Sequence, residues 1–245
     1  MTLLVLLVAI GIQHYLHLLS APYRIDWMGH YYNWMVLKIE YVTKGHGLLG
    51  LAILLVPILL AVSLVLAVTG HLFNKLGYYI VCIIIFWYST DARDYRKSDE
   101  DDSSYPNILV HSYQFLFSRI FWFGISGPVG LTFYYVIFYF RDHLLNRQDT
   151  ESQELEFYSQ KLLSVCDWIP VRLFTLCFAL VGHFPVVFSE WTASLFEGLD
   201  SKLTMITHCS QSIVKTRAEA ASLLNRVLVV WLVAIGLLTI GVFFH

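Results

Sequence analysis

The fold is decided by residues 47–69, which read GLLGLAILLVPILLAVSLVLAVT. This stretch holds no charged residue, and its only proline, Pro57, is tolerated in a membrane helix where neighbouring groups satisfy the freed carbonyl. About 20 helical residues, at roughly 1.5 Å each, cover the hydrocarbon core of a bilayer. The stretch therefore predicts a helix that crosses a membrane.

The rest of the chain has the composition of a membrane protein. Of its 245 residues, 57% are hydrophobic and 14% are charged, and the mean hydropathy is +0.62. That apolar share exceeds the share usual in soluble domains, so a soluble enzyme is excluded. The formal net charge of -2 gives no basic excess of the kind that marks nucleic-acid-binding proteins. The lipid bilayer is the first predicted partner, and a nucleic acid is not one.

Three further stretches predict crossings: residues 1–20, 76–90 and 227–244. A cleaved signal peptide is the alternative for the first of them. Signal peptides begin with a positively charged segment, whereas no Lys or Arg precedes Arg24 here, so a retained anchor is favoured. The sequence thus predicts an all-α, polytopic helical membrane protein with about four spanning helices in a single domain, residues 1–245.

The distribution of basic residues predicts an orientation. The chain has sixteen Lys and Arg residues, and all but Lys75 lie in residues 21–46 and 91–226 if the four predicted spans cross. The positive-inside rule then places both of these regions in the cytoplasm and both termini outside.

The region 91–226 is expected to hold membrane-embedded or interfacial helices. It opens with the charged run 91–106, which must lie in water, and the glycines and proline of residues 124–130 predict a break between two helices. The second of these, residues 129–140, is short for a crossing and suits a re-entrant or interfacial segment.

Two more helical segments follow in this region. Residues 141–167 have apolar residues at helical spacing between charged ones, which predicts an amphipathic surface helix. Residues 168–196 are apolar but interrupted, and they predict a membrane-embedded helix pair.

The most distinctive candidate residues lie at the start of that pair. Asp167 is expected to be the N-cap of a helix with Pro170 in its first turn, a full structural explanation of both residues. Arg172 is harder to explain structurally, because a cation just inside an apolar helix requires a carboxylate or a phosphate partner.

Other polar groups have structural explanations that are favoured over functional ones. His14 and His17 could share a metal ion, but helix packing is favoured because structural sites usually need four ligands. The acidic run 99–102 could hold Mg²⁺, but a solvated loop is favoured. The aromatic residues of 22–35 predict an interfacial belt rather than a pocket mouth. The four cysteines are expected to be free and structural: Cys82, Cys166, Cys177 and Cys209.

The common catalytic motifs are absent from this sequence: the nucleophile elbow, the Walker loop, the zinc-protease HExxH and the dinucleotide fingerprint. The stretch DWIPVRLFTLCFALVGHF at 167–184 instead resembles the AmpE family of bacterial inner-membrane proteins, which is grouped with the adenosylcobinamide-phosphate synthases of the CobD/CbiB type. The order of segments is also similar, with RIDWMGHYYNWM at 24–35, Arg119, and GISGPVG at 124–130.

The resemblance implies a multi-pass protein of the bacterial inner (plasma) membrane. It also implies a signalling modulator linked to β-lactamase induction and cell-wall recycling. The synthase relatives carry a C-terminal block rich in Arg, Asp, His-Pro and Ser-Pro-Asn, and residues 196–225 lack it. Synthase activity is therefore not transferred, and the chain is expected to be an accessory protein rather than an enzyme.

The alternative is a ligase-like or transferase-like membrane enzyme on the shared scaffold. A set of polar residues would then converge on a phosphate-bearing ligand: Asp91, Arg93, Arg119, Asp167, Arg172 and His183. The partner would be this ligand, a cell-wall-derived ligand or a signalling protein. The sequence leaves the cofactor unknown and predicts no metal site. Small-solute transport is disfavoured, because the spans 47–69 and 227–244 have almost no polar residues at their centres.

Overall fold

A computed structural model describes residues 27–43, 47–72, 74–90, 105–145, 150–182, 184–195, 198, 202–211 and 213–243. These residues form helices joined by turns and contain no strand, as predicted. In chain order the elements are α2 (Trp27–Thr43), α3 (Gly47–Leu72), α4 (Asn74–Ser89), α6 (Tyr105–Ser112), the π-helix η1 (Tyr113–Phe117), α7 (Ser118–Leu144), α8 (Thr150–Val181), α9 (Phe184–Ser194), α10 (Lys202–Gln211) and α11 (Arg217–Phe243).

Four helical stretches in the described part are long and apolar enough to cross a membrane: Gly47–Leu72, Asn107–Leu144, Gln153–Val181 and Arg217–Leu237. The first and last match predicted spans, and the predicted span 76–90 is a shorter apolar helix, Leu76–Ser89. The predicted span 1–20 lies outside the described residues. The other two stretches lie in 91–226, where the sequence predicted embedded or interfacial helices.

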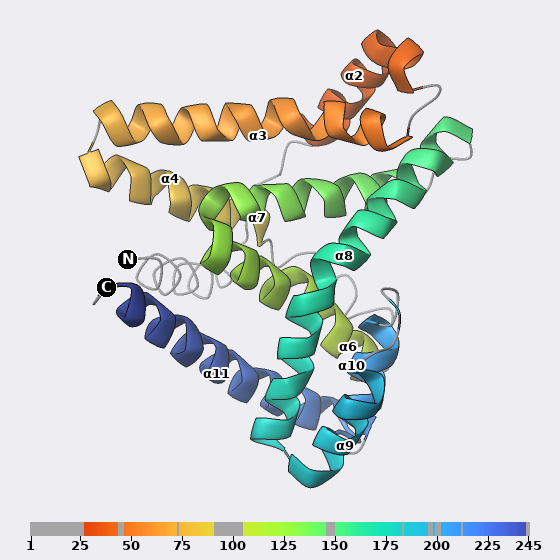
Figure 1. Cartoon of the computed structure of the whole chain (residues 1–245), viewed down its shortest axis with the longest axis vertical. Helices are drawn as coiled ribbons and strands as arrows, with labels where there is room; N and C mark the ends of the chain where they lie inside the picture. Colours follow the sequence, from red (N-terminus) through yellow and green to blue (C-terminus); the bar gives the residue numbers. More distant parts are fainter. Residues whose placement is uncertain are drawn as a thin grey trace.

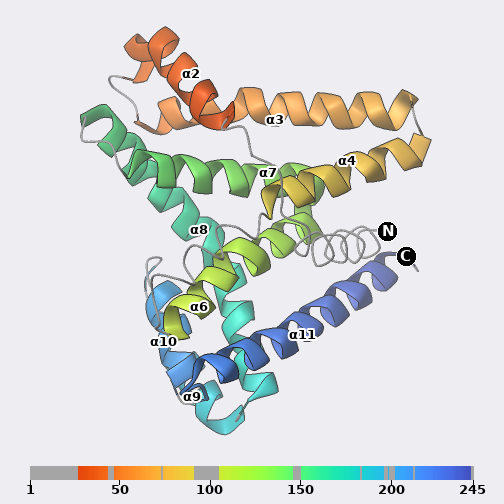
Figure 2. The same cartoon turned by 180° about the vertical axis from the view of Figure 1, so that it is seen from behind.

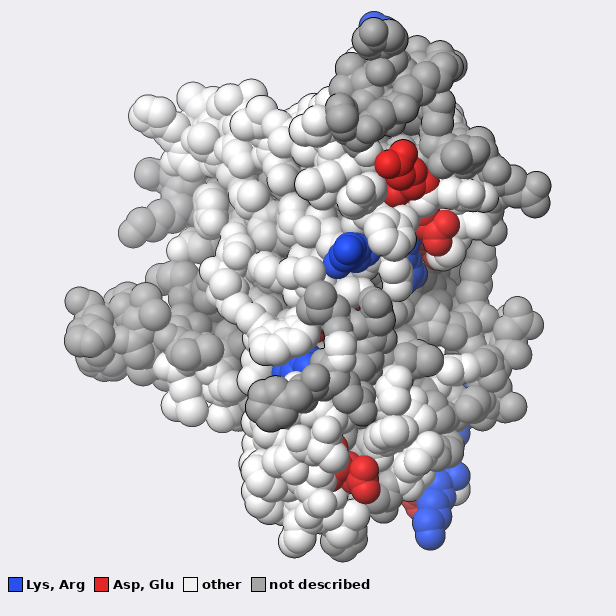
Figure 3. All heavy atoms as spheres, turned by 45° about the vertical axis from the view of Figure 1, so that its right-hand side comes forward, with Lys and Arg blue, Asp and Glu red and all other residues white. Residues whose placement is uncertain are grey.

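The surfaces of α3, α4 and α11 are suited to lipid. Large apolar side chains such as Leu64, Ile80 and Leu237 are exposed on them, and a soluble protein rarely exposes apolar surface on this scale. Figure 3 shows the described charged residues scattered from top to bottom over the middle and right of the face that it draws, while the left side of that face is uncharged or not described. This segregation agrees with a chain whose apolar helices sit in a membrane.

Residues 105–144 fold back on themselves. Gly127 interrupts α7 with φ 65° and ψ -155°, which confirms the predicted break at 124–130. The ring centroids of Phe115 and Phe138 are 5.2 Å apart, whereas residues 23 apart in a straight helix are separated by about 35 Å. Figures 1 and 2 show the resulting V, which bends on the side where α3 meets α4 and where α11 ends. We call residues 105–126 the first arm and residues 128–144 the second arm.

Helix α8 runs across the open side of this V (Figures 1 and 2) and contacts α3, α7, η1, α9, α10 and α11. Its first half packs into one apolar core with α2, α3 and the second arm, through residues such as Leu155 and Leu163. Its second half packs into another core with the first arm, α10 and α11, through residues such as Phe174 and Phe178. Asp167 lies on α8 between these two halves.

The sequence divided α8 incorrectly. It predicted a surface helix over 141–167 and a new helix capped by Asp167, but α8 is continuous from Thr150 to Val181 with Pro170 inside it. A proline in a helix interior removes one backbone hydrogen bond, and the packing of α8 against six other elements compensates for that loss. Asp167 is therefore not an N-cap.

Helix α2 closes over the start of α3. The Tyr31 hydroxyl donates to the carbonyl oxygen of Leu54 at 3.1 Å, in the turn before Pro57, and burial raises the pKa of this phenol. Tyr32 is buried and packs against Phe140, with 5.8 Å between the ring centroids. The interfacial belt predicted for 22–35 is thus partly a packing surface within the protein.

Helix α11 begins ten residues before the predicted span, because a capping box starts it at Arg217. The Glu219 carboxylate accepts from the backbone N–H of Thr216 at 3.3 Å, and the Thr216 hydroxyl accepts from the N–H of Glu219 at 3.3 Å. This reciprocal pair satisfies N–H groups that the first turn of a helix leaves open.

Candidate functional site

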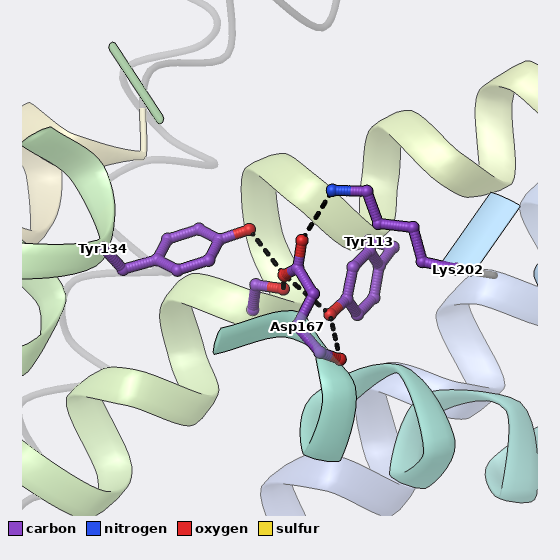
Figure 4. Close-up of polar contacts among 5 residues, drawn as sticks. Tyr113, Tyr134, Asp167 and Lys202 are labelled. Carbon is purple, nitrogen blue, oxygen red and sulfur yellow. Dashed lines mark hydrogen bonds and ion pairs between the residues drawn. The ribbon is translucent and has the colours of Figure 1, made fainter. Parts of the chain in front are cut away.

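A buried carboxylate, that of Asp167, collects hydrogen bonds from both arms of the V. Its side chain is 1% exposed. Tyr113 in the first arm and Tyr134 in the second arm each donate a hydroxyl to Oδ1 at 2.9 Å, and Ser118 donates to the same oxygen at 3.3 Å. Figure 4 shows the tyrosines approaching the carboxylate from different helices. The three hydroxyls partly replace the water that this charge loses on burial.

The fourth donor to this carboxylate is a cation from a different element. Lys202, the first residue of α10, places its Nζ 2.7 Å from Oδ2 of Asp167. The lysine side chain is 11% exposed and the aspartate side chain 1% exposed. We refer to these five residues as the Asp167 cluster: Tyr113, Ser118, Tyr134, Asp167 and Lys202. An ionised carboxylate has about four acceptor positions, so the cluster nearly saturates it.

The π-helix η1 explains how Tyr113 and Ser118 reach the same oxygen. In an α-helix, residues five apart point in directions about 140° apart. Here the backbone N–H of Ser118 bonds to the carbonyl of Tyr113, five residues earlier, and this wider turn brings the two side chains toward one face. Single π-turns of this kind occur frequently at functional sites.

Arg119 follows Ser118 but occupies a separate environment between the arms. It is 1% exposed, and its Nη1 donates to the carbonyl oxygen of Ser89 at the end of α4. Its Cζ lies 4.7 Å from the ring centroid of Phe115 and 5.6 Å from that of Phe138. These rings come from the two arms, so the guanidinium binds the arms together by cation–π attraction.

Arg172 is held by backbone carbonyls. Its Nε and Nη2 donate to the carbonyl of Leu195 at 3.1 and 2.8 Å, and its Nη1 donates to the carbonyl of Trp168 at 2.9 Å. Leu195 follows the last residue of α9, where the helix dipole favours a cation. The guanidinium also stacks over Trp168, with Cζ 4.1 Å from the ring centroid. These contacts give Arg172 a structural role in fixing α9 against α8.

The structure thus places three of the predicted pocket residues, Arg119, Asp167 and Arg172, in adjacent but different surroundings. Asp167 and Arg172 are five apart on α8 and point in different directions. The remaining three, Asp91, Arg93 and His183, lie outside the described residues. Convergence of all six on a phosphate-bearing ligand stays a prediction.

The metal alternatives also lie outside the described part of the chain, since neither His14 and His17 nor residues 99–102 belong to it. Within the described residues, no group of three or more His, Cys, Asp or Glu side chains could hold a metal ion. The four cysteines are free and buried, as predicted.

Sequence reasoning missed four members of the Asp167 cluster. Tyr113 and Tyr134 lie in aromatic apolar stretches, where a tyrosine is read as a packing residue, and Lys202 lies in a polar stretch with no motif. A polar group inside an apolar helix was the one available signal. It was applied to Arg172, whereas Asp167 was explained as an N-cap and named only among the six residues of the enzymatic alternative. The partners of Asp167 are 33 to 54 residues away along the chain.

The Asp167 cluster lies in the part of this chain that matches a known protein family. The family model described as "Regulatory signalling modulator protein AmpE" matches residues 97–243. A curated relative, Protein AmpE of Shigella flexneri, is 29% identical over 162 residues, which cover 61% of this chain and 55% of the relative. The match therefore spans about half of the relative's length. No solved structure matches this chain.

Proposed function

This chain belongs to the AmpE family of regulatory signalling modulator proteins, and from that premise we propose that it modulates a signal at the bacterial inner membrane. The signal we propose is the one that links cell-wall recycling to β-lactamase induction. The observation that carries the proposal is the Asp167 cluster, in which a buried carboxylate binds four side chains from three separate segments. Ionisable groups in apolar helical proteins are costly, and function is the usual reason for them.

The proposed topology places the cluster near the cytoplasmic side. A segment that folds back returns both of its ends to one side, which agrees with a cytoplasmic placement of residues 91–226. Helix α8 then stays on that side, across the open ends of the arms (Figure 1). A cytoplasmic partner or ligand could therefore approach the cluster from water, while the bend of the V lies toward the opposite face.

The test is an induction assay in a host that lacks its own copy of this protein. Asp167→Asn removes the buried charge at constant size, and Asp142→Asn makes the same change at an exposed position of α7. We expect the first variant to alter β-lactamase induction at an unchanged amount of membrane-inserted protein, and the second to behave as the unmodified protein. Equal induction by all three proteins would contradict a role of this site in signalling.

The enzymatic alternative makes a different prediction. A membrane enzyme with a phosphate-bearing substrate must bind that substrate, and a bound ligand stabilises the folded state by mass action. Thermal-shift measurements on detergent-purified protein with nucleotides, cell-wall fragments and corrinoid precursors therefore separate the two functions. A saturable shift with a nucleotide or a corrinoid precursor would favour the enzyme, and no shift with either class would favour the signalling role.

A further inference from the structure

The two arms of the V meet at a bend that has open space beside two of its glycines. Gly127 adopts a backbone conformation that is essentially restricted to glycine. A Cβ atom added at Gly124 or Gly127 would meet nothing within 4 Å, and Ile125 is 66% exposed. The space beside Gly124 and Gly127 leaves room for backbone rotation at these two residues, while Gly130 packs closely on Ser126. A short segment that absorbs backbone rotation is what a hinge requires.

The opposite end of the V is closed by specific contacts. Asp167 binds Tyr113 of the first arm and Tyr134 of the second through one oxygen atom. The aromatic pair of Phe115 and Phe138 and the cation–π contacts of Arg119 also join the arms. The aromatic contacts are apolar and tolerate sliding, whereas the hydrogen bonds to Asp167 have a fixed geometry.

The ion pair connects this closure to α10. Lys202 is the cationic partner of Asp167, and α10 packs on α6, α8 and α9. If Lys202 left, Asp167 would still keep three hydroxyl donors, and the partly exposed ammonium would move into water. The carboxylate would then be a buried charge without its cation, and separation of the arms would admit water to it. Loss of the ion pair therefore favours opening.

From these observations we propose that residues 105–144 form a hinged clamp. Its hinge is Gly127, and its latch is the hydrogen-bonded carboxylate of Asp167 held by Lys202. A change in the position of α10 then changes the spacing of the two arms. The clamp rests on the proposed signalling function, because it would be the element that changes state with the signal. Its test needs no signalling assay, so the clamp and the proposed function can fail separately.

The test is a distance measurement between spin labels at the open end of the V, on the full chain in lipid nanodiscs. Asn107→Cys labels the first arm and Leu145→Cys the end of the second, at two exposed positions, while the four native cysteines are buried. Pulsed electron–electron double resonance gives the distribution of distances between the two labels. We expect one narrow population in the otherwise unmodified protein.

Two perturbations should open the clamp. Tyr134→Phe removes one arm's bond to Asp167 at constant size, and Lys202→Met removes the cation. Each should raise a longer-distance population roughly tenfold or more. Tyr134→Phe loses a hydrogen bond to a charged group, and Lys202→Met leaves a buried carboxylate without its cation, a cost that hydration in the open state relieves. Tyr79→Phe and Lys215→Met are the matched controls, at a half-buried and an exposed position, and should leave the distribution unchanged.

A distribution that stays narrow in both Tyr134→Phe and Lys202→Met would overturn the clamp and leave the cluster as a packing device. If Lys202→Met fails to fold, Tyr134→Phe decides alone, because Tyr134 is the second arm's hydrogen-bond donor to Asp167. Opening in the distance assay together with normal β-lactamase induction would retain the clamp and refute only the proposed function.

Discussion

Replacing Lys202 by methionine should cost more stability than replacing Asp167 by asparagine, because the two partners are buried to different depths. Methionine at 202 leaves a carboxylate that is 1% exposed without its cation. Removing one partner of a buried ion pair costs about 3 to 5 kcal/mol. Because three hydroxyl donors remain on the carboxylate, we expect the unfolding free energy to fall by about 3 kcal/mol, the lower end of this range. Asparagine at 167 leaves an ammonium that is 11% exposed and can hydrate, so we expect a loss of about 1 kcal/mol.

The double variant, Lys202→Met with Asp167→Asn, tests whether the stability lost in Lys202→Met comes from the uncompensated carboxylate. Neutral groups of similar volume often replace a buried ion pair at little cost. The double variant should therefore be more stable than Lys202→Met alone, by about 1 to 2 kcal/mol. Equilibrium unfolding in mixed micelles gives the free energies, and Lys215→Met, at an exposed position, should change stability by less than about 0.5 kcal/mol. The reasoning is refuted if Lys202→Met is no less stable than Asp167→Asn, or if the two losses simply add.

Four further predictions concern the packing around the cluster and the topology. Tyr134→Phe should lower the unfolding free energy by about 1.5 to 3 kcal/mol, whereas Tyr79→Phe, measured in the same micelles, should lower it by much less. Gly127→Ala should cost about 1 to 3 kcal/mol because of its positive φ, and a neutral result would mean that the bend adopts another conformation. Arg172→Ala should increase amide exchange at the end of α9, since Leu195 loses two bonds from the guanidinium; unchanged exchange there would argue against the structural role. A cysteine at Leu145 should react with a membrane-impermeant maleimide from the cytoplasmic side, and reaction from the opposite side would refute the proposed orientation.

The sequence was most informative where one property settled the structure. Residues 47–69 can only be a buried or membrane-crossing helix, and α3 covers them from Gly47 to Leu72. The glycines and proline at 124–130 predicted a break, and Gly127 provides it. Both predictions rest on local backbone chemistry, which a sequence displays directly.

The sequence was least informative where packing overrides local preference. Asp167 and Pro170 are typical of a helix start, yet α8 continues through both. Burial against neighbouring helices outweighs the loss of one backbone hydrogen bond at a proline, and no local pattern records which neighbours are present. The same reason explains why Arg172, expected to bind a carboxylate or a phosphate, is held by the carbonyls of Trp168 and Leu195.

The sequence by itself determined that this is a membrane protein, that it is helical, and that its chain breaks within residues 124–130. These follow from composition and from residue types acting over a few neighbours. Only the tertiary structure decided which groups neutralise the charge at position 167, because Tyr113, Tyr134 and Lys202 reach Asp167 across 54, 33 and 35 residues of chain. The fold-back of the arms and the course of α8 bring these groups together, and both depend on side-chain packing between helices rather than on any single stretch of sequence.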